Sequence, residues 1–204
     1  MPELPEVETV KKGLEDFIVN KTIKKIYLSG FSLRFPIPDN FVSLILEKKI
    51  LSIGRRAKYL LFNLSDNITI ISHLGMSGSY KVLSSQESKD YIPKKHDHVI
   101  FEFVNFKVVY NDPRRFGYIF VTEKDPKEHK LIKSLGPEPM SNKFNENALA
   151  EKFYKKDRPI KNALLDQTII SGLGNIYVCE ALFRSNINPK KKIKQLVYSN
   201  KSPK

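Results

Sequence analysis

The sequence predicts an α+β fold with two domains, and two observations carry this prediction. Short segments rich in β-branched and aromatic residues follow one another over residues 50–122, separated by Gly, Asn, Asp and Ser. Beyond the connector Leu135-Gly-Pro-Glu-Pro139 the apolar residues instead recur at helical spacing. A strand-rich half followed by a helical half is typical of α+β proteins. We therefore expect residues 1–130 to form an antiparallel β-sandwich with an N-terminal helix, and residues 131–204 to form a helical domain.

The elements of the first domain follow from apolar spacing and capping residues. Apolar residues at helical spacing predict a helix over residues 4–18, and a strand is expected over residues 22–29. Asp39 is expected to cap a short helix that carries Phe41, Leu44 and Ile45. The polar stretch 84–95 is expected to be a mobile loop. The sandwich strands are expected at residues 50–53, 59–64, 68–73, 79–83, 99–104, 107–110 and 118–122.

The second domain is predicted to be helical throughout. Helices are expected over residues 145–156 and 160–169, followed by a turn at Gly172-Leu-Gly-Asn175 and a helix over residues 176–183. A last, basic helix is expected to begin at Asn188-Pro189.

The charge of the chain points to a polyanionic partner. Lys and Arg number 35 against 22 Asp and Glu, which gives a formal net charge of +13. Such an excess favours nucleic acid first and an anionic membrane surface second. No acidic residue follows Glu180, a pattern typical both of a nucleic-acid-binding arm and of a solvated chain end.

Cysteine usage and hydropathy restrict the class of protein further. The chain has a single cysteine, Cys179, which excludes an internal disulfide and a cysteine-based metal site. We expect Cys179 to lie in a helix as a small residue of the hydrophobic core. No apolar run approaches the ~18 residues of a membrane span, and no signal-peptide core follows Met1. A reducing cytoplasm is the expected location.

The first ten residues, Met1-Pro-Glu-Leu-Pro-Glu-Val-Glu-Thr-Val10, carry a possible nucleophile. In the simplest interpretation they only open a helix, because proline and acidic residues are common in a first turn. If Met1 is removed, however, Pro2 gains a free secondary amine, which attacks a carbon electrophile and forms a Schiff base. An α-amino group titrates near pH ~8, so a useful fraction is neutral in the cell. Glu3 lies beside this amine and is placed to move the proton that opening of a sugar ring requires.

The stretch Asn111-Asp-Pro-Arg-Arg-Phe-Gly117 is the most informative internal segment. A turn begins at Asp112 and ends at Gly117, so Arg114 and Phe116 are expected on a tight, exposed loop. A large aromatic beside arginines at a loop tip suits insertion between base pairs, with an arginine bonded to the exposed partner base or to phosphate.

Four further features are less specific. Arg55-Arg56-Ala-Lys58 joins three cations to a strand, and in the simplest interpretation their charge protects an edge strand. His96 and His98 have a spacing that suits a metal, although further ligands are not apparent. Met76, judged alone, belongs in the core. Gly172 and Gly174 are weak evidence for a phosphate-cradling loop.

Several of these motifs together resemble a known family. Pro-Glu-Leu-Pro-Glu-Val-Glu-Thr, Arg-Arg-Ala-Lys-Tyr-Leu and Asn-Asp-Pro-Arg-Arg-Phe-Gly are similar to segments of bacterial formamidopyrimidine-DNA glycosylase, which excises oxidised purines such as 8-oxoguanine. At least five motifs in family order extend the resemblance from Pro2 to about Pro189. It implies a helix–two-turn–helix DNA-binding domain, damaged double-stranded DNA as partner, and a monomer in the bacterial cytoplasm, associated with the nucleoid.

The resemblance also implies roles for single residues. Pro2 would attack C1′ of the lesion sugar, Glu3 would handle protons, and Lys58 would contact phosphate and assist the elimination that cuts the strand. Glu6 lines the same pocket or caps the helix. No metal or organic cofactor is needed. The residues implied to fill the gap left by the extruded base are Met76, Arg114 and Phe116. The residues implied to contact DNA are His96, Arg114, Lys156 and Asn175.

The resemblance ends before the C-terminus of the family. Family members continue for several dozen residues, with a loop over the flipped base and a four-cysteine zinc ribbon that one cysteine cannot form. We therefore expect a fragment or a truncated descendant. Apolar surface at Leu182 and Phe183 should be incompletely covered, which lowers stability, and lost phosphate contacts should lower DNA affinity.

Three alternatives remain open at this point. Endonuclease VIII, the sister enzyme for oxidised pyrimidines, uses the same Pro-Glu chemistry, but the continuation Leu-Pro-Glu-Val-Glu-Thr and the loop Asp-Pro-Arg-Arg-Phe-Gly favour the purine enzyme. A non-catalytic remnant would bind DNA without forming a covalent adduct. A basic ribosome-associated protein would have no use for a processed N-terminal proline.

Overall fold

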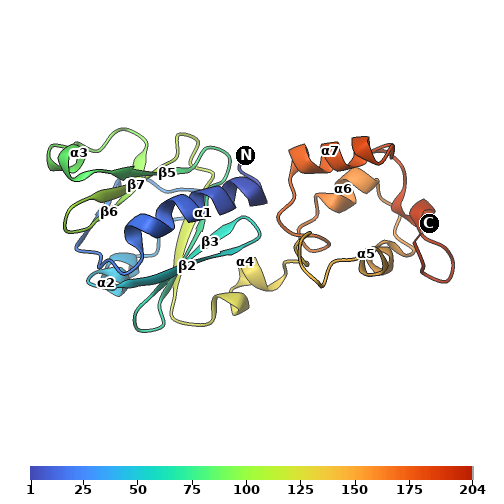
Figure 1. The fold of residues 1–204 in the computed structure, drawn as a ribbon, viewed down its shortest axis with the longest axis horizontal. Helices are drawn as coiled ribbons and strands as arrows, with labels where there is room; N and C mark the ends of the chain where they lie inside the picture. The colour runs from blue at the N-terminus through green and yellow to red at the C-terminus, as the bar shows by residue number, and fades with distance from the viewer. Residues whose placement is uncertain (204) are drawn as a thin grey trace. The chain divides into compact units, whose positions relative to one another are not determined.

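The computed structural model describes residues 1–203 of the chain, which divides into two compact units, Met1–His129 and Lys130–Lys204 (Figure 1). This division differs by one residue from the boundary expected from the sequence. No helix among the described residues is both long and apolar enough to cross a membrane.

The first unit contains two antiparallel four-stranded sheets, which confirms the predicted sandwich (Figure 1). The strand order is β1-β6-β7-β5 in one sheet and β2-β3-β4-β8 in the other. The strands are β1 (Lys25–Leu28), β2 (Ile50–Arg56), β3 (Tyr59–Leu64), β4 (Thr69–His73), β5 (Ser79–Leu83), β6 (Asp97–Glu102), β7 (Lys107–Asn111) and β8 (Tyr118–Thr122).

Both sheets and the N-terminal helix share one core. Burying a large apolar side chain contributes roughly 1.5–3 kcal/mol, so this core is the main source of stability for the unit. Its buried members include Val7 and Leu14 from the helix, Ile53, Phe62 and Ile70 from one sheet, and Val99, Phe101 and Tyr110 from the other.

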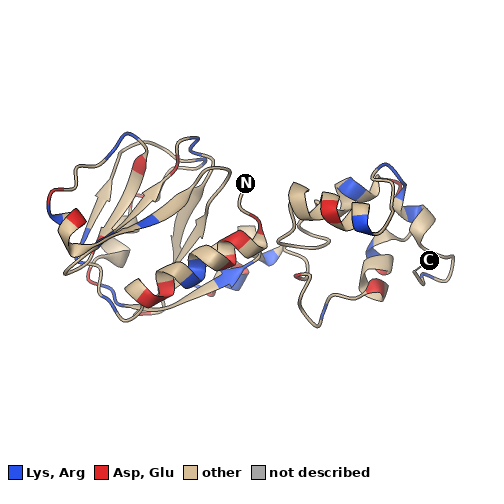
Figure 2. Cartoon of the chain, turned by 45° about the horizontal axis from the view of Figure 1, so that its top comes forward, with Lys and Arg blue, Asp and Glu red and all other residues tan. Residues whose placement is uncertain are grey.

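Helix α1 (Leu4–Ile18) is fixed at its start by a capping box. The Glu3 backbone amide donates to the Glu6 carboxylate at 2.9 Å, and the Glu3 side chain accepts from the amide of Glu6 in return. Acidic and basic residues both occur along this helix (Figure 2). Phe17, near the end of the helix, is 51% exposed. The buried positions are Val7, Leu14 and Ile18.

Besides shifts in the bounds of β2, β4, β6 and β7, three details of the first unit differ from the sequence-based expectation. Strand β1 begins at Lys25, because Thr22 forms only an isolated bridge. Asn40 rather than Asp39 is the N-cap residue of α2 (Phe41–Ile45). The expected mobile loop contains α3 (Ser85–Lys89), which begins with a second capping box that the sequence analysis missed.

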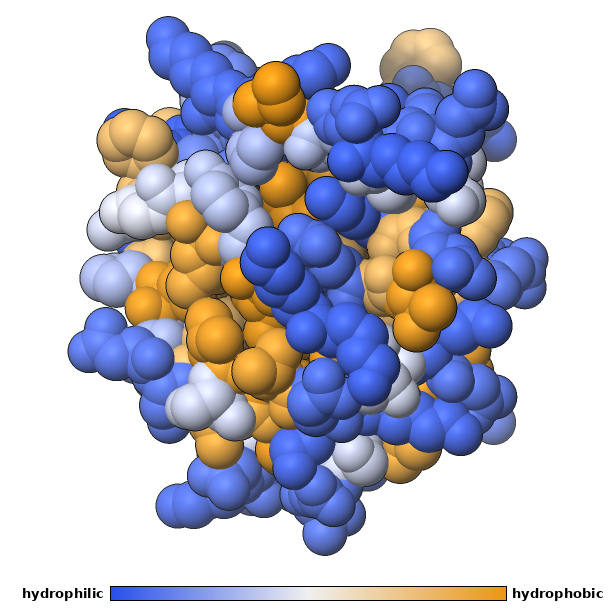
Figure 3. All heavy atoms as spheres, turned by 90° about the vertical axis from the view of Figure 1, so that its left-hand side faces the viewer, coloured by the Kyte–Doolittle hydropathy of each residue, from blue (hydrophilic) through white to orange (hydrophobic). Residues whose placement is uncertain are grey.

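On the side of the first unit that Figure 3 faces, apolar side chains form a patch that is bordered by hydrophilic ones.

The second unit is helical, as predicted. It contains α4 (Lys130–Lys133), α5 (Glu146–Phe153), α6 (Ile160–Leu164), α7 (Asn175–Arg184) and a 3₁₀ turn, η2 (Ile193–Leu196); a shorter 3₁₀ turn, η1 (Pro126–Glu128), ends the first unit. The Asn145 side chain caps α5 by accepting from the Ala148 amide at 2.9 Å. The core of this unit includes Phe153, Ile160, Ala163, Ile170, Val178 and Ile193.

Three expected helices of the second unit are wrong in length or kind. Helix α5 ends at Phe153 instead of residue 156. Helix α6 ends at Leu164 instead of residue 169, because Asp166 accepts from the Thr168 amide and hydroxyl at 3.0 and 2.7 Å and so stabilises a turn. The expectation of a last basic helix is also wrong, since up to residue 203 only the short η2 turn follows Asn188-Pro189.

Side-chain burial along α7 corrects two further expectations. Val178 and Leu182 face the core, so Cys179 lies outside that stripe and is exposed rather than buried. Leu182 is covered, with 4% exposure, whereas Phe183 is 81% exposed as expected.

Candidate catalytic and nucleic-acid site

Glu3, which follows the half-buried Pro2 in the chain, interacts electrostatically with Lys58 in the first unit. Glu3 is 2% exposed and Lys58 is 6% exposed. Burial lowers the pKa of Lys58 below its usual value, while the charges of Glu3 and Glu6 act in the opposite direction. The structure therefore brings two of the three predicted catalytic side chains into electrostatic contact at the start of α1. An ammonium group with a lowered pKa gives up its proton more readily, which suits acid–base work.

Glu6 contributes to this site and also caps the helix. Its carboxylate holds the Glu3 amide, and its charge acts on Lys58. The two roles that the sequence analysis left open for Glu6 therefore coexist.

Lys58 is presented by a two-residue turn between β2 and β3. Arg56 and Tyr59 pair across the turn, and Ala57 has the positive φ of +52°. Ala57 is 1% exposed, so the turn is packed against the protein rather than projecting into solvent.

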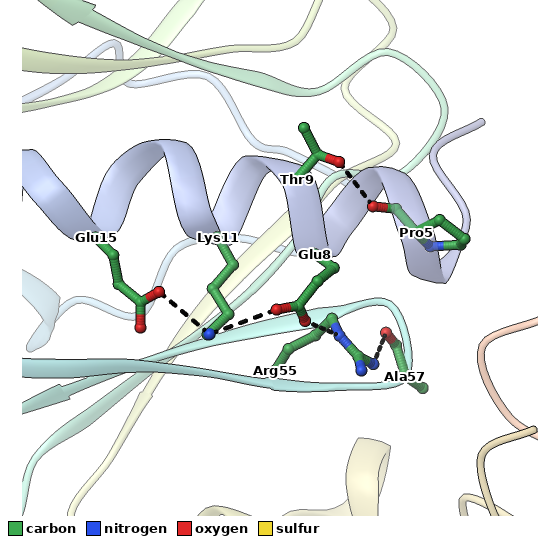
Figure 4. A network of polar contacts seen from close by, with 7 residues as sticks. All are labelled: Pro5, Glu8, Thr9, Lys11, Glu15, Arg55 and Ala57. Atoms are coloured by element: carbon green, nitrogen blue, oxygen red, sulfur yellow. Dashed lines mark hydrogen bonds and ion pairs between the residues drawn. The ribbon is translucent and has the colours of Figure 1, made fainter. Parts of the chain in front are cut away.

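An ion-pair network ties this turn to α1 (Figure 4). Arg55 Nε donates to Glu8 Oε2 at 2.6 Å, and Arg55 Nη1 donates to the Ala57 carbonyl at 3.0 Å. Lys11 Nζ lies 3.5 Å from the second Glu8 oxygen and 3.2 Å from Glu15. The hydrogen bond from Arg55 lowers the pKa of Glu8. Strand β2 is an edge strand, but Arg55 is committed to this contact rather than to protecting the edge.

An aromatic cluster that the sequence analysis did not identify lies next to Lys58. Tyr118 Oη donates to Tyr59 Oη at 2.8 Å, and the ring of His73 stacks on Tyr118 with centroids 4.9 Å apart. The Gly75 amide donates to His73 Nδ1 at 2.9 Å. Burial, with the nearby cations of Lys58 and Arg34, lowers the pKa of His73 to about 4. His73 is therefore neutral at physiological pH and acts as an acceptor for the turn that follows it.

The turn that carries Met76 touches the loop that carries Arg114 and Phe116. Gly75 has φ +61°, and a Cβ at this position would lie 2.4 Å from the backbone of Phe116. Met76 is 42% exposed and Phe116 is 44% exposed, so the assignment of Met76 to the core is wrong. Arg114 lies over the Phe116 ring, with Cζ 4.8 Å from its centroid. The structure therefore brings all three predicted gap-filling residues to one surface region.

Asp112 links the turn that carries Met76 to the loop that carries Phe116 by hydrogen bonds. Its side chain is fully buried; Oδ1 accepts from the Ser77 hydroxyl at 2.5 Å and Oδ2 accepts from the Gly117 amide at 2.8 Å. The Arg114 amide in turn donates to Ser77 Oγ at 3.1 Å. The sequence identified Asp112 only as a turn former, because Ser77 is distant in the chain.

His98 is accounted for without a metal. It is buried, Nε2 donates to the Asp112 carbonyl at 3.0 Å, and Nδ1 lies 3.0 Å from Ser29 Oγ. Within residues 1–203 no three His, Cys, Asp or Glu side chains group as a metal site. His96 is half-buried at the surface before β6.

The remaining predicted DNA contacts lie in the second unit. Lys156 is exposed in the loop after α5, and not on a helix as expected. Asn175 is the first residue of α7, directly after the glycine turn. Gln167 braces that turn: Nε2 donates to the Leu173 carbonyl at 2.9 Å, and Oε1 accepts from the Gly172 amide at 2.9 Å.

Family models match both units. The formamidopyrimidine-DNA glycosylase N-terminal domain matches residues 1–119, and the formamidopyrimidine-DNA glycosylase H2TH domain matches residues 135–202. The chain belongs to the formamidopyrimidine-DNA glycosylase family.

Curated and solved members of the family agree with this assignment. The formamidopyrimidine-DNA glycosylase of Agrobacterium fabrum is 44% identical over all of this chain and 74% of its own length. That of Bartonella henselae is 47% identical over 94% of this chain and 69% of its own length. A Lactococcus lactis formamidopyrimidine-DNA glycosylase bound to DNA that contains an AP site is 38% identical, with a TM-score of 0.86 over 98% of this chain and 76% of that chain.

The close approach of the two turns in this family member predicts a specific stability effect. Gly75→Ala should destabilise the protein by about 3 kcal/mol, because the new methyl group meets backbone and the φ is strained. Gly30→Ala is the matched control: Gly30 has φ +77° with nothing within 4 Å, so only strain of about 1 kcal/mol applies. Urea unfolding of both variants measures the difference. Equal losses would show that the two turns do not pack as described.

Proposed function

We propose that this chain is a bifunctional DNA glycosylase and AP lyase that excises oxidised purines from duplex DNA and then cuts the strand. As a member of its family it is a DNA glycosylase of base excision repair. The observation that carries the proposed mechanism is the burial of Lys58 beside Glu3, next to Pro2 at the start of α1.

The proposed chemistry uses an amine as nucleophile. After removal of Met1, the Pro2 nitrogen attacks C1′, the bond from C1′ to the base breaks, and the base leaves with a proton. Glu3 protonates the ring oxygen O4′ as the sugar opens to the iminium. The iminium acidifies C2′–H; loss of that proton expels the 3′ phosphate by β-elimination. The Lys58 ammonium holds phosphate and relays protons in this step. Water then hydrolyses the iminium and frees Pro2.

Extrusion of the damaged nucleotide is proposed for the surface formed by the two turns. Unstacking costs a few kcal/mol, part of which an inserted side chain recovers. Met76 and Phe116 supply exposed apolar groups, and Arg114 supplies donors for the base left without a partner. The Asp112 carboxylate holds the turns together, so these side chains enter the duplex as one unit.

Damaged double-stranded DNA is the proposed partner. Solved relatives include Lactococcus lactis proteins in complex with DNA containing an abasic site. The net charge of +13 suits a phosphate backbone. His96, Arg114 and Lys156 are proposed phosphate contacts, as is Asn175 with the first amides of α7. We place the protein in the bacterial cytoplasm at the nucleoid, as a monomer.

The first experiment compares the protein with Met1 removed and the protein with Met1 retained, the latter made with the aminopeptidase blocked. Borohydride trapping on duplex DNA with one abasic site should yield far more adduct from the processed form. Retention turns the Pro2 nitrogen into an amide, so the adduct should fall by about 100-fold. Both forms should bind DNA alike.

Equal trapping by both forms would refute the N-terminal nucleophile. Salt-sensitive DNA binding with no adduct from either form would establish the alternative of a non-catalytic DNA-binding remnant. Preference for an oxidised pyrimidine over 8-oxoguanine would favour the endonuclease VIII alternative.

Two variants separate gap filling from phosphate binding. Phe116→Ala should slow excision of 8-oxoguanine about tenfold and affect cutting at a preformed abasic site much less, because extrusion is then easier. Lys156→Ala should weaken binding of both substrates and reduce the salt slope by about one. Single-turnover rates and binding titrations measure these effects. An equal loss on both substrates for Phe116→Ala would contradict its proposed role.

A further inference from the structure

We propose that Glu8 and Arg55 form a clamp that positions Lys58 for the elimination step. This inference rests on the proposed function, in which Lys58 assists the reaction. Neither Glu8 nor Arg55 has a place in the proposed chemistry itself, so the clamp is a positioning device.

The geometry of Arg55 joins the two parts of the site (Figure 4). Its Nε contacts Glu8 on α1 at 2.6 Å, and its Nη1 contacts the Ala57 carbonyl at 3.0 Å. Glu8 lies on the same rigid helix that Glu3 caps, and Ala57 is bonded directly to Lys58. One planar guanidinium therefore sets the separation between the helix start and the lysine-bearing turn.

The conformation of the turn depends on the same contact. Ala57 holds φ +52°, a value that residues with a Cβ rarely adopt. A hydrogen bond from Arg55 to the Ala57 carbonyl stabilises this conformation. Relaxation of Ala57 to a negative φ would redirect the next residue, Lys58, whose side chain is buried and has little room to compensate.

The environment of this ion pair differs from that of a surface pair. The side chains of Arg55 and Glu8 are 15% and 31% exposed, and Lys11 supports the second Glu8 oxygen. The pair Lys24–Glu47, also in the first unit, is 45% and 59% exposed. Exposed pairs are weakly coupled to structure, whereas a half-buried arginine that donates to two different acceptors fixes their separation. Displacements near 1 Å at a reacting centre can change a rate by about 100-fold.

The first arm of the test does not depend on activity. Acetylation of lysines, followed by peptide mass spectrometry, should modify Lys58 slowly in the wild type, because it is 6% exposed. Glu8→Gln and Arg55→Lys should accelerate modification of Lys58 about tenfold, since release of the turn exposes the amine. Glu47→Gln, which breaks the exposed pair, should not. Unchanged protection of Lys58 in both clamp variants would overturn the proposal.

The second arm is a double-mutant cycle on abasic duplex DNA at saturation. Glu8→Gln and Arg55→Lys should each slow strand cutting about tenfold and leave the DNA affinity within about twofold. Arg55→Lys keeps the charge but cannot serve both acceptors, so it also tests geometry. In a Lys58→Met background, either clamp variant should cause no further loss. Thermal melting confirms that each variant is folded.

If a clamp variant slows strand cutting by the same factor in the Lys58→Met background as in the wild type, the clamp is overturned. Glu8 and Arg55 would then act independently of Lys58. A clamp variant with normal cutting, or a normal Lys58→Met enzyme beside slow clamp variants, would overturn it as well. A wild type that never forms an adduct refutes the proposed function instead, and the acetylation arm then decides the clamp alone.

Discussion

A charged amine buried beside a carboxylate is the constraint on which this site depends. Removing the Lys58 ammonium from water is costly, and the charges of Glu3 and Glu6 offset part of that cost. The first turn of α1 must therefore lie against the β2–β3 turn, which brings the N-terminus of the chain to the same place. The capping box that starts the helix and the ion pair from Glu8 to Arg55 maintain this arrangement.

The sandwich gives these groups a rigid base. Its two sheets share one core with α1, so the packed strands hold the turns at their ends in fixed positions. Asp112 joins two such turns through hydrogen bonds to Ser77 and Gly117, and the exposed apolar side chains lie directly above it. The chemistry and the gap filling that we propose thus belong to different parts of one domain, each held by a buried or half-buried carboxylate.

Local sequence signals predicted much of the fold. Strands β3, β5 and β8 have the expected bounds, because each is a short β-branched or aromatic run between polar residues or glycine. The expected bounds were wrong where side-chain hydrogen bonds to the backbone determine where a helix begins or ends. Asp166 ends α6 early, and Ser84 with Glu87 starts a helix in a stretch that is too polar to show an apolar face. Cys179 was misplaced because helix phase, not residue type, sets burial.

The site was predictable only in part, for a physical reason. Motifs resembling a family indicated Lys58 and Phe116, but the contacts that position them are tertiary. Glu8 and Arg55 are separated by 47 residues, and no local pattern links them. His73 gave no signal beyond its place at a strand end, since its role depends on stacking against Tyr118.

Locating the trapped bond tests the central claim most directly. After borohydride reduction on abasic DNA, the adduct should be digested and the modified residue identified by tandem mass spectrometry. The account predicts the sugar remnant on the nitrogen of Pro2, in the N-terminal peptide that lacks Met1. A remnant on the side-chain amine of Lys58, with Pro2 unmodified, would contradict it, because the buried lysine would then be the nucleophile.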